Sequence, residues 1–233
     1  MPPTQNPQKN KRTLQNICRV ITQKYGTPDL GNLADPLDEL VYIITTFKTN
    51  ESNYQRVFQR LKEAFKDWNA LLSAPIEQVK SIVKPAGLSN QKAPRLQSIL
   101  QRIKKENGSL SLEFLNDLPD DEVEAYLRSF PGVGKKGARC IMLYSLKRKV
   151  LPVDTHTIRI FRRLGYLDWS INPKSAQDII QEMVPAKIRR ELHVNLVAHG
   201  RATCTARQPS CDRCCIQRHC NAYHTGNFNS IRN

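Results

Sequence analysis

The stretch FPGVGKKGA, at positions 130–138, decides how this sequence is interpreted. It joins two segments with apolar residues at helical spacing, DDEVEAYLRSF before it and KKGARCIMLYSL after it. Gly132 and Gly134 allow a tight turn with positive φ, which points several backbone N–H groups at one place. The next helix adds its first-turn donors and the positive end of its dipole. With Lys135, Lys136 and Arg139 on the next turn, the stretch favours phosphate binding over an ordinary corner between helices.

The helical signal continues outward from this stretch in both directions. Apolar residues recur at helical spacing in nearly every periodic segment, and Asp35 followed by Pro36 is typical of a helix start. Gly108 predicts the end of a helix that runs through QKAPRLQSILQRIKKEN. Strand-like alternation is absent from the sequence, apart from a possible extended stretch at 149–153. The sequence therefore predicts an all-α fold.

The composition points to a polyanionic partner. The chain has 233 residues, of which 39% are hydrophobic, and a formal net charge of +15. That charge fits DNA or RNA, although some basic proteins bind neither. Membrane association is not expected, because no apolar run approaches the roughly 18 residues that span a bilayer. The start of the chain, MPPTQNPQKNKR, lacks the apolar segment of a secretory signal and is interpreted as a flexible basic tail at 1–12.

Seven cysteines are present, and five of them lie between Cys204 and Cys220. The odd number argues against a disulfide framework, and available thiols fit a reducing intracellular compartment such as the cytoplasm or nucleoid. Cys204, Cys211, Cys214 and Cys220 have the spacing C-x6-C-x2-C-x5-C, which suits tetrahedral zinc or a [4Fe–4S] cluster. A zinc site more often has two closely spaced pairs, and only one is present here. Cys215 is interpreted as a bystander.

The segment PGVGKKGA followed by VDTH resembles the helix–hairpin–helix DNA glycosylases, most closely the endonuclease III family. The resemblance extends from about Pro36 to Cys220. It implies a two-lobed fold with a six-helix domain at 28–148 and an iron–sulfur cluster domain formed by 13–27 and 149–233. It also implies that the four-cysteine spacing holds a [4Fe–4S] cluster rather than zinc.

The resemblance assigns a nucleophile. In this family the lysine that follows GVG and one basic residue attacks the sugar, and that position is Lys136. The monofunctional relatives lack this lysine. An amine attacks only when neutral, and the start of a helix, with Lys135 and Arg139 nearby, disfavours the ammonium form. On the residues alone, either lysine could instead clamp a phosphate.

Asp154 in VDTH corresponds to the family's second catalytic residue. Its carboxylate could take the proton of the lysine or stabilise positive charge on the sugar. Alternatively, Asp154 simply caps the helix that follows, and the two roles are compatible. His156, two residues further on, either lines the lesion pocket or caps the same helix.

Chemistry on a base requires that the nucleotide leave the stack. By the family pattern Leu88 resembles the wedge residue, and the loop containing Phe47 supplies the side chain that fills the gap. A glutamine is usual where Phe47 stands, and a phenyl ring cannot make the amide hydrogen bonds of glutamine to the opposite base. Lys48 adds a charge beside it. As an alternative, Phe47 is a core aromatic at a helix end.

The resemblance implies a bifunctional DNA glycosylase and abasic-site lyase in base excision repair. It would excise a damaged, oxidised pyrimidine and nick the strand by β-elimination. The expected partner is double-stranded DNA with a flipped damaged nucleotide or an abasic site, bound by a monomer. Two alternatives stay open: a glycosylase for a methylated or hydroxymethylated pyrimidine, and a non-catalytic module that only docks on DNA. The sequence does not name the base.

Overall fold

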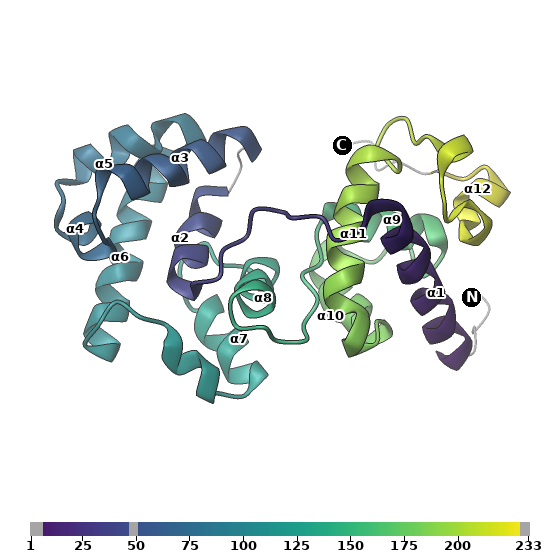
Figure 1. The fold of residues 1–233 in the computed structure, drawn as a ribbon, viewed down its shortest axis with the longest axis horizontal. Helices are drawn as coiled ribbons and strands as arrows, with labels where there is room; N and C mark the ends of the chain where they lie inside the picture. The colour runs from purple at the N-terminus through teal and green to yellow at the C-terminus, as the bar shows by residue number, and fades with distance from the viewer. Residues whose placement is uncertain (1–6, 47–50, 229–233) are drawn as a thin grey trace. The chain divides into compact units, whose positions relative to one another are not determined.

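The computed structural model describes residues 7–46 and 51–228, apart from the side chains of residues 7–10, 51, 52 and 54. Over the described residues every regular element is a helix (Figure 1), so the predicted all-α fold is confirmed. The stretch at 149–153 is irregular rather than a strand. Phe47 and Lys48 lie outside the described residues. No helix in the described part of the chain is both long and apolar enough to cross a bilayer.

The chain divides into two compact units, Asn32–Arg148 and Met1–Gly31 with Lys149–Asn233. The first contains α2 (Pro36–Thr46), α3 (Glu51–Ala64), α4 (Trp68–Ser73), α5 (Ile76–Val83), η1 (Lys84–Ala86), α6 (Ser89–Asn107), η2 (Glu113–Asp117), α7 (Asp120–Arg128) and α8 (Lys135–Tyr144). The second contains α1 (Pro7–Tyr25), α9 (Thr155–Leu164), α10 (Pro173–Met183), η3 (Ala186–Ile188), α11 (Arg189–Ala202), η4 (Cys211–Arg213), η5 (Gln217–His219) and α12 (Asn221–Thr225).

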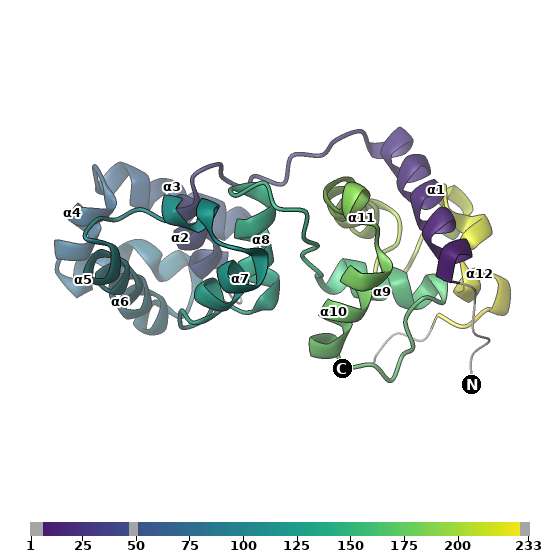
Figure 2. The same cartoon turned by 90° about the horizontal axis from the view of Figure 1, so that it is seen from below.

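In the unit Asn32–Arg148, α2 is the central helix and packs against α3, α6 and α8 (Figure 2). It begins as predicted: Pro36 is its first residue, and the Asp38 amide donates to the Asp35 carboxylate over 2.8 Å. Helix α6 ends at Asn107 because Gly108 adopts the left-handed conformation, with φ of 72°. Both helix boundaries that the local sequence predicted are therefore confirmed.

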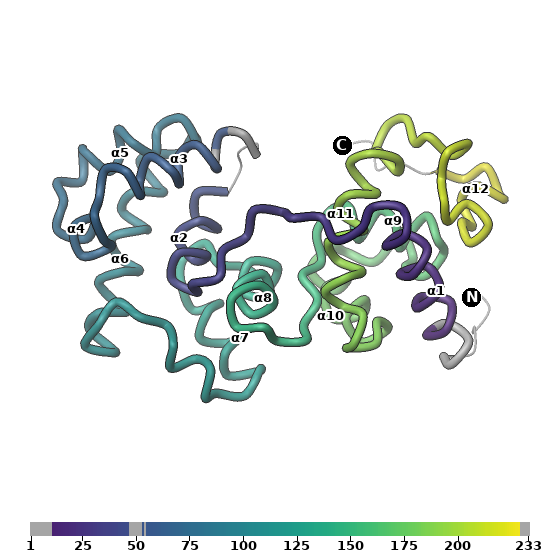
Figure 3. Tube along the Cα trace, viewed as in Figure 1, coloured from purple at the N-terminus to yellow at the C-terminus, as the bar shows by residue number. Residues whose placement is uncertain are grey.

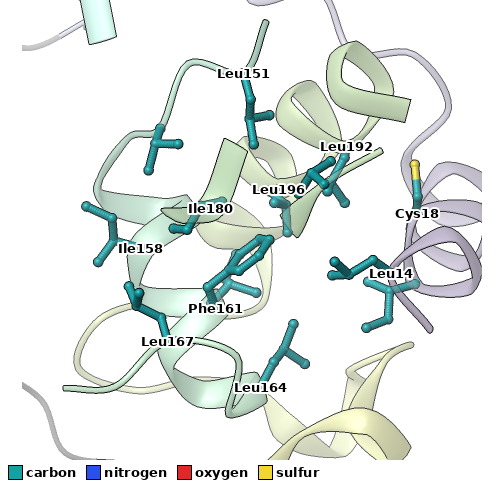
Figure 4. Packing of buried hydrophobic residues seen from close by; sticks show 14 of the residues in the cluster. Leu14, Cys18, Leu151, Ile158, Phe161, Leu164, Leu167, Ile180, Leu192 and Leu196 are labelled. Atoms are coloured by element: carbon teal, nitrogen blue, oxygen red, sulfur yellow. The ribbon is translucent and has the colours of Figure 1, made fainter. Parts of the chain in front are cut away.

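The other unit has a core made by α1, α9, α10 and α11, in which Phe161 lies among apolar side chains from several helices (Figure 4). Leu14, Ile17 and Ile21 of α1 are buried in this core. Helix α1 begins at Pro7, so the interpretation of residues 1–12 as a flexible tail is wrong for residues 7–12. Once packing fixes the later turns, each further residue adds a hydrogen bond without a new nucleation cost.

After α11 the chain follows an irregular path through η4 and η5 to α12 (Figure 3). Few apolar side chains are buried in this C-terminal loop; Ile216 and Ala222 are two that are. The buried Arg163 of α9 holds the loop instead, because its guanidinium donates to the Thr205 carbonyl over 2.7 Å and to the Ala206 carbonyl over 2.9 Å. Polar contacts and thiols therefore take the place of a larger core here.

Candidate active site and cysteine site

The hairpin between α7 and α8 is closed by a hydrogen bond from the Val133 amide to the Phe130 carbonyl, 3.1 Å long. Gly132 has φ of 87° and needs glycine's freedom. Gly134 is different: with φ of −85° and ψ of 175° it is extended and serves as the N-cap of α8. The expectation of positive φ at both glycines is wrong for Gly134. The turn still places the first-turn N–H groups of α8, which have no partner within the helix, directly after it.

Lys136 is exposed and lies in the first turn of α8, where the sequence placed it. Its neighbours differ from expectation. Arg139 is only 3% exposed and donates to Glu124 over 2.8 Å, while the Lys135 ammonium lies 3.8 Å from the same carboxylate. Glu124 therefore compensates two cations that were expected to disfavour the ammonium form of Lys136, and Arg139 is buried rather than available to a phosphate.

Glu39 in α2 is a site residue that sequence reasoning missed. It is fully buried, and its carboxylate accepts from the Leu33 amide over 2.8 Å and from the Asn32 side chain. Burial raises the pKa of Glu39 to about 7, while hydrogen bonds and the charge of Lys136 act to lower it. The only local signal is an acidic residue within the apolar segment LDELVYII. The unit that contains Lys136 therefore also contains a buried carboxyl group on which the charge of Lys136 acts.

Asp154 caps α9, because its carboxylate accepts from the Thr157 amide over 2.7 Å. The capping role expected from the sequence is therefore confirmed. Burial alone would raise the pKa of Asp154. The charges of His193 and His156 and the hydrogen bonds from Thr157 outweigh burial and hold that pKa below its ordinary value. His193, buried in α11, carried no recognisable signal in the sequence.

His156 does not cap α9; that alternative is wrong because Asp154 fills the position. Instead Arg159 donates to His156 Nδ1 over 3.0 Å and to the Gly200 carbonyl over 2.9 Å. A Cβ atom at Gly200 would lie 2.5 Å from His156 Nδ1, so α9 and α11 approach closely only because residue 200 is glycine. Burial lowers the pKa of His156, while the charge of Asp154 acts to raise it.

Leu88, the predicted wedge residue, lies on the turn before α6. Its side chain is 38% exposed, and its backbone is left-handed with φ of 55°. Leucine rarely adopts this conformation, so the turn is strained. Leu88 and Lys136 belong to the unit Asn32–Arg148, whereas Asp154 and His156 belong to the other unit.

Cys204, Cys211, Cys214 and Cys220 together line one cavity with about 290 Å³ of empty space, part of it open to solvent. Cys215 is not among the lining residues, and all seven cysteines are free thiols. Among the described residues, no three His, Cys, Asp or Glu side chains are grouped closely enough to bind a single metal ion. The four cysteines of the predicted spacing therefore line one common cavity, together with Arg163 and Tyr223.

The surroundings of the cysteines also suit thiolates that bind a metal group. Burial raises the pKa of Cys214 to about 11, so its thiolate would need a metal to stabilise it. Arg163 Nη1 lies 3.2 Å from Cys204 Sγ, and the Cys220 thiol faces the Arg163 carbonyl. His199 Nε2 lies 3.7 Å from Cys214 Sγ. Such polar groups orient metal ligands and tune them.

The chain belongs to the HhH-GPD superfamily of base excision DNA repair proteins, whose family model matches residues 40–186. It is therefore a member of a DNA glycosylase superfamily.

Individual relatives agree with this assignment. The chain is 26% identical over 220 residues to endonuclease III of Thermotoga maritima, covering 94% of this chain and 98% of that protein. It is 33% identical over 171 residues to the DNA glycosylase/AP lyase ROS1 of Arabidopsis thaliana, covering 66% of this chain. The matched segments are 12% and 13% of the lengths of ROS1 and of DEMETER-like protein 2 from the same plant.

Solved structures share the fold. An endonuclease III bound non-covalently to DNA superposes with a TM-score of 0.79 at 19% identity, covering 93% of this chain and 97% of that one. A thermostable thymine-DNA glycosylase superposes with a TM-score of 0.77 at 21% identity, covering 94% and 98%. The fold that the resemblance implied is therefore confirmed.

Proposed function

We propose that this chain is a bifunctional DNA glycosylase and abasic-site lyase that acts on duplex DNA during base excision repair. The observation that carries the proposal is Lys136: an exposed lysine in the first turn of the helix that follows the glycine hairpin. The similarity to ROS1, named as a glycosylase and AP lyase, supports it. The net charge of +15 suits a DNA partner.

In the proposed reaction the neutral Lys136 amine attacks C1′ of the sugar. The glycosidic bond breaks and the base leaves with its electron pair and gains a proton. The sugar ring opens to give a Schiff base on Lys136, and loss of a C2′ proton then expels the 3′ phosphate by β-elimination. The dipole at the start of α8 favours the neutral amine. Glu39 opposes it less than an ordinary carboxylate would, because its pKa of about 7 leaves part of it uncharged.

Asp154 takes the second catalytic role in this proposal. Its lowered pKa keeps it ionised at neutral pH, and a carboxylate stabilises positive charge that develops on a sugar as the glycosidic bond breaks. The hydrogen bond from Thr157 holds one carboxylate oxygen at the start of α9. Capping therefore fixes the orientation of the catalytic group.

Four cysteines, Cys204, Cys211, Cys214 and Cys220, would hold a [4Fe–4S] cluster, since they line one cavity and have the spacing of the family's iron–sulfur loop. When bound, such a cluster supplies four metal–thiolate links to a loop with little apolar content. Its proposed task is to hold this loop in place rather than to act in cleavage.

The hairpin and Leu88 would make the contacts with DNA. The hairpin with Lys135 would bind a phosphate and position the strand, and Leu88 would enter the stack beside the flipped nucleotide. The role of Phe47 as the side chain that fills the gap stays a prediction. An oxidised pyrimidine is the proposed substrate. A methylated or hydroxymethylated pyrimidine is the second candidate, because Phe47 and Lys48 depart from the family pattern at the place where a glutamine is usual.

Borohydride trapping on a duplex with an abasic site tests the lyase. The wild-type chain and Lys135→Ala should give a covalent protein–DNA adduct, whereas Lys136→Ala should give none. Equal trapping by Lys136→Ala would overturn the assignment of the nucleophile. Binding without trapping by any variant would support the non-catalytic alternative.

A panel of duplexes then identifies the base. Each duplex carries one oxidised, methylated or hydroxymethylated pyrimidine opposite each of the four bases, and base release is measured under single-turnover conditions. Release of oxidised pyrimidines alone supports the leading proposal. Release of the methylated or hydroxymethylated bases alone would replace it with the second candidate.

A further inference from the structure

Lys92 is the only lysine that is fully buried among the described residues, with 0% of its surface exposed. Burying an ammonium is unfavourable unless hydrogen bonds replace its water. Here the Lys92 ammonium donates to the Thr45 carbonyl and to the Ala86 carbonyl, each over 2.8 Å. These two carbonyls are far apart in sequence, so the side chain joins two separate segments of the unit.

The first segment is the end of α2. Thr45 is in the last turn of this helix, where carbonyls lack intrahelical partners and the dipole attracts a cation. The second segment is the turn that leads to Leu88: Ala86 ends η1, and Gly87 and Leu88 follow with φ of 71° and 55°. The Lys92 side chain therefore ties the strained turn to the end of α2.

Lys92 also holds this turn through its backbone. Its amide donates to the Leu88 carbonyl over 2.9 Å, so one residue binds the turn on both sides of Gly87. Leu88 itself points a partly exposed side chain to solvent and has no side-chain cap to fix α6 at its start. Lys92 thus holds the turn through its side chain and through its backbone.

We propose that Lys92 is the positioning residue for Leu88. Its buried ammonium holds the Ala86–Leu88 turn in the strained conformation that presents the leucine for insertion into the duplex, which rests on the proposed function. Burial, and secondarily the charge of Arg95, lower the pKa of Lys92 to about 8, which still leaves the ammonium as the main form at pH 7. The cation therefore persists where the carbonyls need it.

The test uses the full chain and a duplex with a non-cleavable tetrahydrofuran abasic analogue beside 2-aminopurine, whose fluorescence rises on unstacking. Leu88→Ala should lose most of the fluorescence rise, because it removes the side chain that would fill the gap in the stack. Lys92→Met, of similar length without donors, should lower the rise to a similar extent. The double variant should be no worse than Leu88→Ala alone, because Lys92 acts through Leu88. Lys66→Met, at an exposed position of the same unit, is the matched control and should match the wild type.

Circular dichroism and thermal unfolding establish which variants are folded. If Lys92→Met does not fold, Lys92→Gln replaces it, because an amide can still donate to one carbonyl; it should lose part of the amplitude. A folded Lys92 variant with the wild-type fluorescence rise would overturn the inference. A double variant whose loss equals the product of the two single losses would overturn it too, because Lys92 would then act independently of Leu88. If the wild-type chain gives no rise but still forms the borohydride-trapped adduct, the inference fails and the proposed lyase stands; if it gives neither, the proposed function fails as well. If the wild-type fluorescence rise is normal and depends on Leu88 but not on Lys92, the inference about Lys92 fails and the proposed function stands.

Discussion

In the unit Asn32–Arg148, Lys136 is exposed at the start of α8, whereas in the other unit Asp154 is half-buried beside the imidazoles of His156 and His193. The surroundings of the lysine are set by the turn before its helix and by Glu39. Those of the aspartate are set by the packing of α9 on α11, where Gly200 permits close approach. One unit presents its proposed nucleophile through backbone geometry, and the other holds its proposed catalytic carboxylate by tertiary contacts.

The units also differ in the interactions that stabilise them. The unit Asn32–Arg148 is filled by apolar side chains of its own helices, while the C-terminal loop of the other unit relies on Arg163 and on thiols. Changes in the loop should therefore act through the proposed cluster, and changes in the hairpin should act through backbone conformation. The following predictions test this difference.

The largest effect is expected at the cysteines. Cys211→Ser should remove the visible absorption near about 400 nm and lower the free energy of unfolding by more than about 4 kcal/mol, because loss of a metal group is among the most damaging changes. Iron analysis, absorption spectra and urea unfolding measure this. Cys215→Ser is the matched control and should keep both properties; an equal loss in both variants would break the assignment of ligands.

Asp154→Asn should come next. The amide oxygen can still accept from Thr157, so we expect α9 to keep its cap and stability to change by less than about 1 kcal/mol. The loss of the negative charge should slow base release by about 10² to 10⁴-fold. Single-turnover kinetics measure the rate. Asp67→Asn removes the charge of the cap of α4 and should leave the rate unchanged. Unaltered release by Asp154→Asn would reduce Asp154 to a structural cap.

Glu39→Gln probes the buried carboxyl of the lysine's unit. Because the folded-state pKa of Glu39 is raised to about 7, the folded chain binds more protons than the unfolded chain between the two pKa values, and stability falls as pH rises through that window. Glutamine removes this fall and should stabilise the protein by about 2 kcal/mol at about pH 8, with little change at about pH 5. Urea unfolding at both pH values measures it.

The matched control for Glu39→Gln is Glu77→Gln, since the Glu77 side chain is 77% exposed. It should change stability by less than about 0.5 kcal/mol at either pH. A pH profile of Glu39→Gln parallel to that of the wild type would show that the carboxyl is not the source of the pH dependence.

The smallest effect is expected in the hairpin. Gly132→Ala should cost about 1 kcal/mol because alanine is strained at φ of 87°, and it should weaken binding to an abasic duplex as the turn shifts. Gly134→Ser is the control: its backbone is extended, a Cβ meets nothing within 4 Å, and serine is a good N-cap. Fluorescence anisotropy and thermal unfolding compare them. If Gly132→Ala and Gly134→Ser lose DNA binding and stability equally, the positive φ of Gly132 is not what the turn depends on.

The sequence by itself determined the features that depend on neighbours along the chain. The helical spacing gave the all-α fold, Asp35 and Asp154 showed their caps by residue type, and Gly108 and Gly132 marked backbone positions that favour glycine. The clustered cysteines indicated a shared site because four ligands close in sequence need only a local loop to meet.

Tertiary structure alone decided the features that join distant residues. Glu124 pairs with both Lys135 and Arg139, and Lys92 reaches the carbonyl of Thr45, 47 positions away. His193 acts on Asp154 from another helix. Side-chain charge and burial depend on which helix faces combine, and residue type does not reveal the partner. For that physical reason a lysine or glutamate that looks solvated in the sequence can be a buried and decisive group in the fold.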